Sequence, residues 1–352
     1  MDELSLLAEQ FSTSGPIEQI TPLGHGLIND TFLVTDAHGQ WVLQRINRQV
    51  FPQPEWIMQN LQRLAAHVYS KPAGICRLQI PRVLPSTQHL PYFVDAQQDY
   101  WRALEFVPAS YSKETLESTT DAEQIGWALG HFHHLCNDLD CATLHDTLPG
   151  FHITPGYLAQ YQQACAQGFK LPQDDAFAFC RDFIQEQAPF AANLQTAQEQ
   201  GKLRLRVTHG DPKVNNFLFQ QHTHQVTSLI DLDTVKPGLI HYDLGDCLRS
   251  CCHNLDTGAF DLDLCRAILT PYIAECRCSL TAADYDFLYP AIELLPFELG
   301  LRFFTDYLQG NRYFKVTSPQ QNLSRALEQF QLCQTIQRQR QSIEDLISTL
   351  RY

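Results

Sequence analysis

Basic residues are scarce in this sequence. Its 352 residues include 25 Lys and Arg against 39 Asp and Glu, which gives a formal net charge of -14 at pH 7. Proteins that hold the phosphate backbone of DNA or RNA need a positive surface, so this balance argues against a nucleic-acid partner. A small phosphate-bearing ligand is still compatible with the charge, because a metal ion or a few basic groups can neutralise it locally.

Long apolar runs are also missing. A membrane-spanning helix needs about 18 or more apolar residues in a row, and the apolar stretch AIELLPFELGLRFF is interrupted by Glu293, Pro296 and Glu298. The opening MDELSLLAEQ is acidic and lacks the basic segment that begins a secretory signal peptide. We therefore expect no membrane partner and a cytoplasmic location.

Paired CxxC motifs are absent although the chain has 12 cysteines. Zinc sites of the knuckle type are built from such pairs, and the nearest approaches here are Cys251-Cys252 and Cys276-x-Cys278. The cysteines are therefore expected to be small buried thiols. So many cysteines without a secretory signal favour a reducing compartment.

The first 105 residues have the pattern of a sheet that carries one helix. Residues 31–35 and 40–46 alternate apolar and polar side chains around a turn at 36–39, which predicts an antiparallel hairpin. The run PQPEWIMQNLQRLAAHVY then has helical spacing, with Pro54 near its first turn. Three more strand-like runs follow, RLQIPRVL, PYFVDA and DYWRALEFVP.

Beyond Pro108 the pattern becomes helical. Apolar residues of 121–139 fall on one face, and residues 237–352 end in a long amphipathic segment. Between these helices, LRLRVTHGDPKVNNFLF and VTSLIDLDTVKPG predict a short strand pair around a turn at 220–224. The sequence thus predicts an α+β protein of two lobes, a small antiparallel β-rich lobe over 1–105 and a large α-helical lobe over 106–352.

The stretch HGDPKVNN, residues 209–216, places three chemically distinct groups close together. Asp211 and Asn216 are five residues apart, Lys213 lies between them, and Pro212 disfavours a helix, so these side chains should project from a loop. The strand pair that follows ends at Asp231, and its hairpin should return Asp231 to the neighbourhood of Asn216.

This set of groups suits phosphoryl transfer. A carboxylate accepts the proton of an attacking hydroxyl, and hard oxygen ligands hold Mg²⁺ against the phosphates. The protein-kinase catalytic loop has the same Asp-to-Asn interval and a later metal-binding Asp. We assign Asp211 as the base, Lys213 as the contact to the transferring phosphoryl group, and Asn216 and Asp231 as magnesium ligands. The alternative is a solvated loop whose Asp caps a turn.

A second candidate is LGHGLIND, residues 23–30, with Gly24 and Gly26. Glycines allow backbone amides to approach phosphates. The dinucleotide-binding fingerprint G-x-G-x-x-G is excluded, because Asn29 occupies its third glycine position and a strand follows instead of a helix. Two glycines between strands match the kinase hairpin that covers the phosphates, although a mere turn would have the same pattern.

In kinases the second hairpin strand presents a lysine to the nucleotide phosphates. Here Gln44 has the aligned position and Arg45 supplies a positive charge. Because alternate residues of a strand point to opposite faces, only one of the two can face the cleft, and both remain candidates. In kinases a helix residue pairs with this strand cation, and its identity here is also undecided. Glu55 lies too early in the predicted helix, whereas Asn60 lies nearer the position expected for this partner.

Residues 104–108, LEFVP, connect the two predicted lobes. In a kinase-like chain this segment would be the hinge whose backbone binds adenine, which makes Glu105 and Val107 candidate nucleotide contacts, although any linker could occupy this position.

The run HFHHL suggests a metal site, but no acid completes one near His131 and His134, so polar packing against the catalytic loop is the preferred interpretation. Asp243 and Asp246 in HYDLGDCLRS are expected to brace that loop by hydrogen bonds, with helix capping as the alternative.

Taken together, His209-Gly210-Asp211, Asn216 and Ile230-Asp231 resemble the signature of the aminoglycoside phosphotransferase and choline kinase group, HGDxxxxN followed by an ID strand. Four separated segments resemble the N-acetylhexosamine 1-kinase subgroup more closely: residues 26–32, 43–51, 230–239 and 299–310.

The resemblance implies a bilobal protein-kinase-like fold and an ATP- and Mg²⁺-dependent kinase that acts on the anomeric hydroxyl of GlcNAc or GalNAc. It also implies that Arg302 and Tyr313 contribute to the sugar pocket beside Asp211 and Lys213. Two alternatives remain. An antibiotic or amino-alcohol kinase of the same fold would suit the negative charge, and a non-catalytic nucleotide-binding module would explain the missing lysine.

Overall fold

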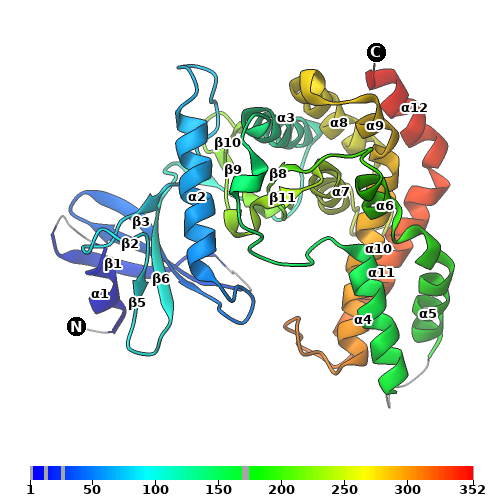
Figure 1. Ribbon diagram of the computed structural model, residues 1–352, viewed down its shortest axis with the longest axis horizontal. Helices are drawn as coiled ribbons and strands as arrows, with labels where there is room; N and C mark the ends of the chain where they lie inside the picture. Colours follow the sequence, from blue (N-terminus) through cyan, green and yellow to red (C-terminus); the bar gives the residue numbers. More distant parts are fainter. Residues whose placement is uncertain (1–2, 12–14, 25–27, 169–173, 352) are drawn as a thin grey trace.

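The computed structural model describes residues 3–11, 15–24, 28–168 and 174–351. Figure 1 shows two lobes side by side, a small one built on a sheet and a larger, mainly helical one, with the two chain termini at opposite ends of the molecule. The predicted fold class is confirmed.

The small lobe is an antiparallel sheet in the order β1-β2-β3-β6-β4, with β5 also paired to β6. Its strands are β1 (Ile17–Pro22), β2 (Asp30–Asp36), β3 (Gly39–Ile46), β4 (Val83–Leu84), β5 (Phe93–Val94) and β6 (Tyr100–Glu105). The predicted hairpin is β2-β3, and each run taken as a strand contributes to the sheet.

The two faces of this sheet have different neighbours. On one face Trp41 and Leu43 of β3 join a buried apolar cluster with Leu7 of α1 (Glu3–Ala8). The opposite face carries Gln44, and Gln44 lies directly across from Arg102 of β6 in the register. Since side chains alternate along a strand, this second face is the one turned toward the helical lobe.

The helix expected after the hairpin is α2 (Pro54–Tyr69), with Pro54 in its first turn. Its buried stripe includes Leu61, Leu64 and Val68, and it contacts α3 of the large lobe. Pro is tolerated at this end because its missing N–H would have no intrahelical partner.

The large lobe consists mainly of helices. They are α3 (Thr119–Cys136), α4 (Thr154–Gln167), α5 (Asp175–Gln187), α6 (Asn193–Glu199), α7 (Ile240–Cys251), α8 (Leu262–Cys276), α9 (Ala282–Asp286), α10 (Leu288–Leu308), α11 (Gln321–Arg338) and α12 (Arg340–Arg351). The closest packing is between α3 and α8, where a Cβ at Gly126 would lie 2.1 Å from the Ile268 carbonyl oxygen. Among the described residues, no helix is long and apolar enough to cross a membrane.

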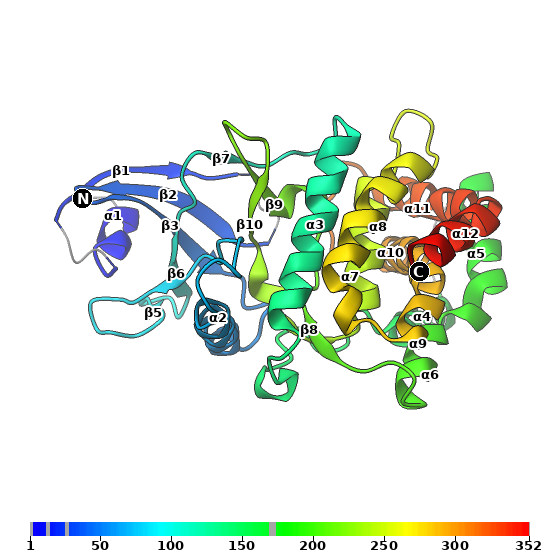
Figure 2. The same cartoon turned by 90° about the horizontal axis from the view of Figure 1, so that it is seen from above.

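Two small sheets, one of two strands and one of three, lie where the lobes meet. β8 (Arg206–Thr208) pairs with β11 (Lys236–Gly238), and β9 (Phe217–Gln220) pairs with β10 (Val226–Leu229) and with β7 (Ser110–Tyr111). Figure 2 shows β9 and β10 between the N-terminal sheet and α3. These two sheets flank residues 209–216 and the segment around Asp231.

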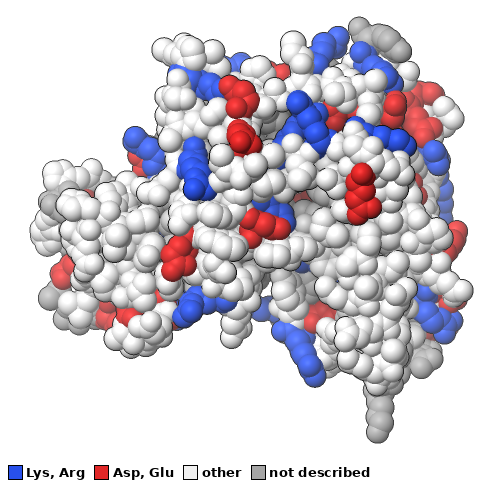
Figure 3. Space-filling view, in the orientation of Figure 1, with Lys and Arg blue, Asp and Glu red and all other residues white. Residues whose placement is uncertain are grey.

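All 12 cysteines are free, and most are buried, as expected for small core thiols. On the face drawn in Figure 3, acidic and basic side chains are interspersed.

Candidate active site

The backbone of the predicted catalytic loop is held by one buried carboxylate. Asp243 of α7 is fully buried and accepts hydrogen bonds from the backbone N–H groups of His209 (2.6 Å) and Gly210 (2.8 Å). The expected bracing role of Asp243 is confirmed. Asp246, the second residue proposed for this role, instead accepts a hydrogen bond from Arg249 at 2.8 Å.

The histidine-rich run does support this loop, but through a residue that the sequence did not single out. His133 places Nε2 at 2.8 Å from the Asp243 carboxylate. His131 faces elsewhere, with Nδ1 at 2.6 Å from Glu275 and Nε2 accepting from the Arg77 backbone N–H. Choosing between them required the packing of α3 against α7 and α8, which helical spacing alone does not give.

His209 links the catalytic loop to the strand end at Asp231. Its Nε2 lies 3.0 Å from the Ile230 carbonyl oxygen and its Nδ1 accepts from the Asp211 N–H, so the proton belongs on Nε2. Burial lowers the pKa of His209 and favours this neutral form. Gly210 has φ +88°, and a Cβ there would lie 2.8 Å from Thr234, so no other residue fits.

The predicted catalytic side chains lie together. Lys213 donates to the Asp211 carboxylate at 2.7 Å, and the Asn216 amide nitrogen donates to the Asp211 carbonyl oxygen at 2.7 Å. Burial alone would lower the pKa of Lys213, but Asp211 and Asp231 raise it, so the ammonium form is favoured. Since its nitrogen is committed to Asp211, the Asn216 amide presents Oδ1 as its free ligand atom.

The hairpin returns Asp231 to Asn216, as predicted, with the Ile230 N–H donating to the Asn216 carbonyl oxygen at 2.9 Å. Asp231 adopts the left-handed conformation (φ 62°), which turns its exposed side chain out of the strand. Restricted hydration in the cleft raises the pKa of Asp231 to about 6, with added effects of Asp233 and Asp211. The described residues provide no hydrogen bond to this carboxylate, which therefore fits a hard divalent cation that replaces its proton.

The glycine-rich segment is described in part. Gly24 has φ +70°, and Gly26 lies outside the described residues. Asn29 does not point freely into the cleft: its nitrogen donates to Asp233 at 2.8 Å and its oxygen accepts from the Asn47 N–H at 3.0 Å. Asn29 therefore ties this segment to the large lobe, a role that the motif alone did not suggest.

The choice between Gln44 and Arg45 is resolved by the alternation of β3. Arg45 lies on the outer face, where it pairs with Asp30 and with Asp99. Its assignment as a nucleotide contact is therefore wrong. Gln44 faces the large lobe, and its Oε1 accepts two hydrogen bonds from Arg102.

Arg102 and Asp233 are the functional candidates that the sequence analysis missed. They form an ion pair at 2.5 Å in which both side chains are 2% exposed. An arginine among the apolar residues of DYWRALEFVP was the available signal, because a charged residue on the inner face of a buried strand needs a partner.

Neither Glu55 nor Asn60, the two candidate partners on α2, pairs with a cation of the sheet. Glu55 accepts from the Tyr100 hydroxyl at 2.5 Å. Asn60 is 1% exposed and uses its amide on backbone groups of the large lobe, donating to His145 and Val235. Glu55 therefore ties the helix to β6 within the small lobe, and Asn60 ties it to the large lobe.

The predicted hinge follows β6. The Glu105 carboxylate accepts a hydrogen bond from Nε of Arg82 at 2.8 Å. Val107 is buried, its carbonyl oxygen accepts from Ser110, and its N–H has no hydrogen bond among the described residues. The backbone N–H of Val107 is therefore available to a nucleotide base, whereas the backbone N–H of Glu105 already donates to the Arg82 carbonyl oxygen at 3.0 Å.

The two residues taken from the family resemblance come together on the large lobe. The guanidinium of Arg302 in α10 has no hydrogen bond or ion pair among the described residues. It is surrounded by aromatic rings, with centroid distances of 5.2 Å to Phe151, 5.0 Å to Tyr157, 5.9 Å to Tyr313 and 5.6 Å to Phe314. Tyr313 is 55% exposed. We call these five residues the arginine box.

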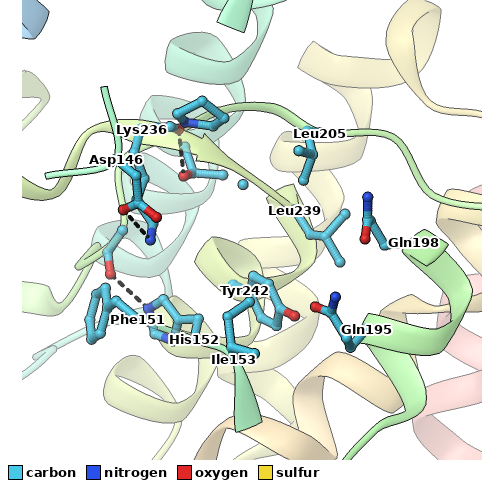
Figure 4. Close-up of a pocket in the computed structure, with 14 residues that line it drawn as sticks. Asp146, Phe151, His152, Ile153, Gln195, Gln198, Leu205, Lys236, Leu239 and Tyr242 are labelled. Carbon is cyan, nitrogen blue, oxygen red and sulfur yellow. Dashed lines mark hydrogen bonds and ion pairs between the residues drawn. The ribbon is translucent and has the colours of Figure 1, made fainter. Parts of the chain in front are cut away.

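The arginine box adjoins the catalytic loop through His152, whose ring lies 4.0 Å from that of Phe151. His152 is buried, with Nδ1 at 2.8 Å from Glu298 and Nε2 at 2.8 Å from the Gly210 carbonyl oxygen. Desolvation opposes the charged form, but Glu298 raises the pKa of His152, so both nitrogens can carry protons. His152 and Tyr242 line a cavity of about 230 Å³, and the ring of Tyr242 stacks on that of His152 (Figure 4).

Glu293 and Glu298, the two acids of α10 that could bind an ammonium group of a cationic acceptor, already have partners. Glu298 accepts from His152 and from Thr154 (2.6 Å). Glu293 accepts from Gln337 of α11 at 2.7 Å. These two carboxylates are therefore committed to the interior of the large lobe.

The fold and the site define a kinase-like phosphotransferase. The chain belongs to the phosphotransferase enzyme family, whose model matches residues 19–277.

Solved structures share the fold over nearly the whole chain. One is an aminoglycoside phosphotransferase from Alicyclobacillus acidocaldarius, with 18% identity, a TM-score of 0.65, and 97% of this chain and 96% of that one covered. Another is the amicoumacin kinase hAmiN in complex with AMP-PNP, Ca²⁺ and Ami, with 16% identity, a TM-score of 0.61, and 94% and 93% covered. A third is a choline/ethanolamine kinase family protein from Mesorhizobium loti, with 16% identity, a TM-score of 0.60, and 96% and 93% covered. At these identities the likeness concerns the fold.

Proposed function

We propose that this protein is an ATP- and Mg²⁺-dependent kinase that phosphorylates the anomeric hydroxyl of an N-acetylhexosamine such as GlcNAc or GalNAc. The observation that carries the acceptor assignment is the arginine box, a cation with free donors beside the catalytic loop. The nucleotide assignment is supported by the family and by the arrangement of Asp211, Lys213, Asn216 and Asp231.

The reaction follows from the positions of these groups. The acceptor oxygen attacks the terminal phosphorus of ATP, the bond from that phosphorus to the ADP oxygen breaks, and Asp211 takes the hydroxyl proton. Lys213 moves from Asp211 to the transferring phosphoryl oxygens. The Asn216 Oδ1 atom and the Asp231 carboxylate would hold Mg²⁺, which neutralises the phosphate charge when it is bound.

The arginine box favours an acceptor that is neutral and rich in oxygen. The free guanidinium donors of Arg302 suit carbonyl or hydroxyl oxygens, such as those of an acetamido group, and they would repel an ammonium group. Aromatic faces such as that of the exposed Tyr313 suit the apolar C–H face of a sugar ring.

A second candidate is an antibiotic or amino-alcohol kinase. It is favoured by the activities of structural neighbours, which include a microcompartment-associated aminopropanol kinase, and by the net charge of -14. Against it stands the commitment of Glu293 and Glu298 to interior partners, since a cationic acceptor needs free acids near Asp211.

One experiment tests the proposal. The protein is incubated with ATP and Mg²⁺ and a panel of N-acetylhexosamines, aminoglycosides, aminopropanol and choline, and phosphorus NMR identifies each product. An anomeric sugar phosphate is expected, and turnover of the cationic compounds alone would refute the sugar assignment. Asp211→Asn should keep ATP-dependent thermal stabilisation while losing turnover. Full activity of that variant would remove Asp211 from its role as base.

A further inference from the structure

The sheet of the small lobe lacks the usual cation on β3. Kinase-like enzymes place a lysine there to meet the nucleotide phosphates. In this chain the inward residue at that point is Gln44, and Arg45 faces outward in pairs with two surface acids. An amide cannot neutralise phosphate, so the positive charge must come from another residue.

Arg102 is the cation that reaches the same place from the neighbouring strand. It lies directly opposite Gln44 in the β3-β6 register, so both side chains project from the same face of the sheet. Gln44 Oε1 accepts from Nε at 3.0 Å and from Nη2 at 2.7 Å of Arg102. The Gln44 amide nitrogen is fixed in turn by the Thr31 hydroxyl at 2.9 Å. Gln44 thus orients the guanidinium.

Gln44 does not use all the donors of Arg102. Nη2 also binds Asp233 at 2.5 Å. Nη1 is buried and has no hydrogen-bond partner among the described residues. A buried donor without a protein partner can bind a ligand or an ordered water. Asp231, the expected magnesium ligand, lies two residues from Asp233 and within electrostatic range of Arg102.

We propose that Arg102 binds the phosphates of the nucleotide through Nη1, in the role that a β3 lysine fills in other kinases, with Asp233 as its anchor. This inference rests on the proposed ATP-dependent function. Only a guanidinium can serve Gln44, Asp233 and a phosphate oxygen together, because its five donors lie in one fixed plane.

The anchor also explains the position of Asn29. The second oxygen of Asp233 accepts from the Asn29 amide at 2.8 Å, so one carboxylate holds both Arg102 and the segment that follows the glycine-rich turn. Phosphates that reach Arg102 would therefore meet the sheet, Asn29 and the proposed metal ligand Asp231 around one point. This places the nucleotide phosphates between Asn29 and Asp231.

Calorimetric titration without acceptor tests the inference, with MgAMP-PNP and adenosine as ligands. Arg102→Gln should weaken MgAMP-PNP by about tenfold or more, while adenosine, which lacks phosphates, should change by less than about twofold. Arg45→Gln is the matched control, an arginine of the same sheet on its opposite face, and should leave both affinities unchanged.

A second variant separates phosphate binding from folding. Arg102→Gln leaves Asp233 buried without its cation, so Arg102→Gln/Asp233→Asn removes both charges together. This double variant should fold and still bind MgAMP-PNP weakly. Wild-type affinity in the double variant would overturn the inference, because Arg102 would then serve only to neutralise Asp233. An equal loss for adenosine would overturn it as well. A wild-type protein that binds no nucleotide would refute the proposed function itself.

Discussion

Asp243→Asn is the substitution that most directly tests how the catalytic loop is held. The carboxylate accepts from two backbone N–H groups, those of His209 and Gly210, and from His133. An asparagine has one acceptor oxygen, so one of the two backbone donors must face an NH₂ group. His133 can adapt by exchanging its ring proton, since its other nitrogen contacts the Tyr272 hydroxyl at 3.0 Å. The backbone groups have no such freedom.

The expected loss of stability follows from the number of hydrogen bonds that are lost. Losing one hydrogen bond to a buried carboxylate costs about 2–3 kcal/mol, and a loss of that order lowers Tm by several degrees, on the order of 4 °C in a chain of this size. Because Gly210 precedes Asp211, a shift of this loop by about 1 Å would lower kcat by about 100-fold. The KM for ATP should change less than kcat, because Arg102 and the Val107 N–H, the proposed contacts of the phosphates and the base, lie outside this loop.

Thermal unfolding and steady-state kinetics provide the readout. The control is Asp138→Asn, whose carboxylate is 66% exposed and pairs with Lys71 and His67 at the surface, where a lost pair costs about 0–1 kcal/mol. The reasoning is wrong if Asp243→Asn keeps both its Tm and its kcat at the level of that control.

Three further outcomes are expected. The pKa of His152 is raised by Glu298 despite burial, so its contribution to stability is complete below about pH 6.5 and is lost as pH rises through the raised value. Replacement by Gln should therefore flatten the alkaline decline of Tm, and a wild-type Tm that does not fall above neutral pH would contradict this. Arg302→Lys keeps the charge but loses the planar fork, so the KM for the sugar should rise by about tenfold while the KM for ATP stays constant. Asp231→Asn should abolish turnover and remove the extra thermal stabilisation that Mg²⁺ adds to the ATP complex; an unchanged Mg²⁺ effect would exclude Asp231 as a ligand.

Sequence spacing was sufficient to predict the part of the site whose residues lie close together in the chain. Asp211, Lys213 and Asn216 lie on one short loop, and a tight hairpin leaves Asp231 no other place than beside Asn216. These positions are determined by a few consecutive backbone conformations, including the left-handed Gly210. A pattern of residue types therefore determined their neighbourhood before any tertiary contact was known.

The missed residues depend on pairing between distant segments. The alternation of side chains along β3 implies that only one of Gln44 and Arg45 can face inward. It does not indicate which one, because both faces of the hairpin carry polar residues. Arg102 becomes a neighbour of Gln44 only through the β3-β6 register, across 58 positions of the sequence. The motif IDLD contains both Asp231 and Asp233. The two differ in burial, since Asp233 is buried and Asp231 is exposed, and a motif does not encode burial.

The arrangement of charges around Asp211 is compatible with nucleotide binding in so acidic a protein. Three carboxylates meet there, and each has a different environment. Asp211 is paired with Lys213, and Asp233 is paired with Arg102. Asp231 forms no ion pair with a cation among the described residues, and its two acidic neighbours help to raise its pKa. A divalent cation beside Asp231 would offset this repulsion and favour the ionised form. Since such a cation is also attracted to phosphates, we expect nucleotide and Mg²⁺ to bind as one unit.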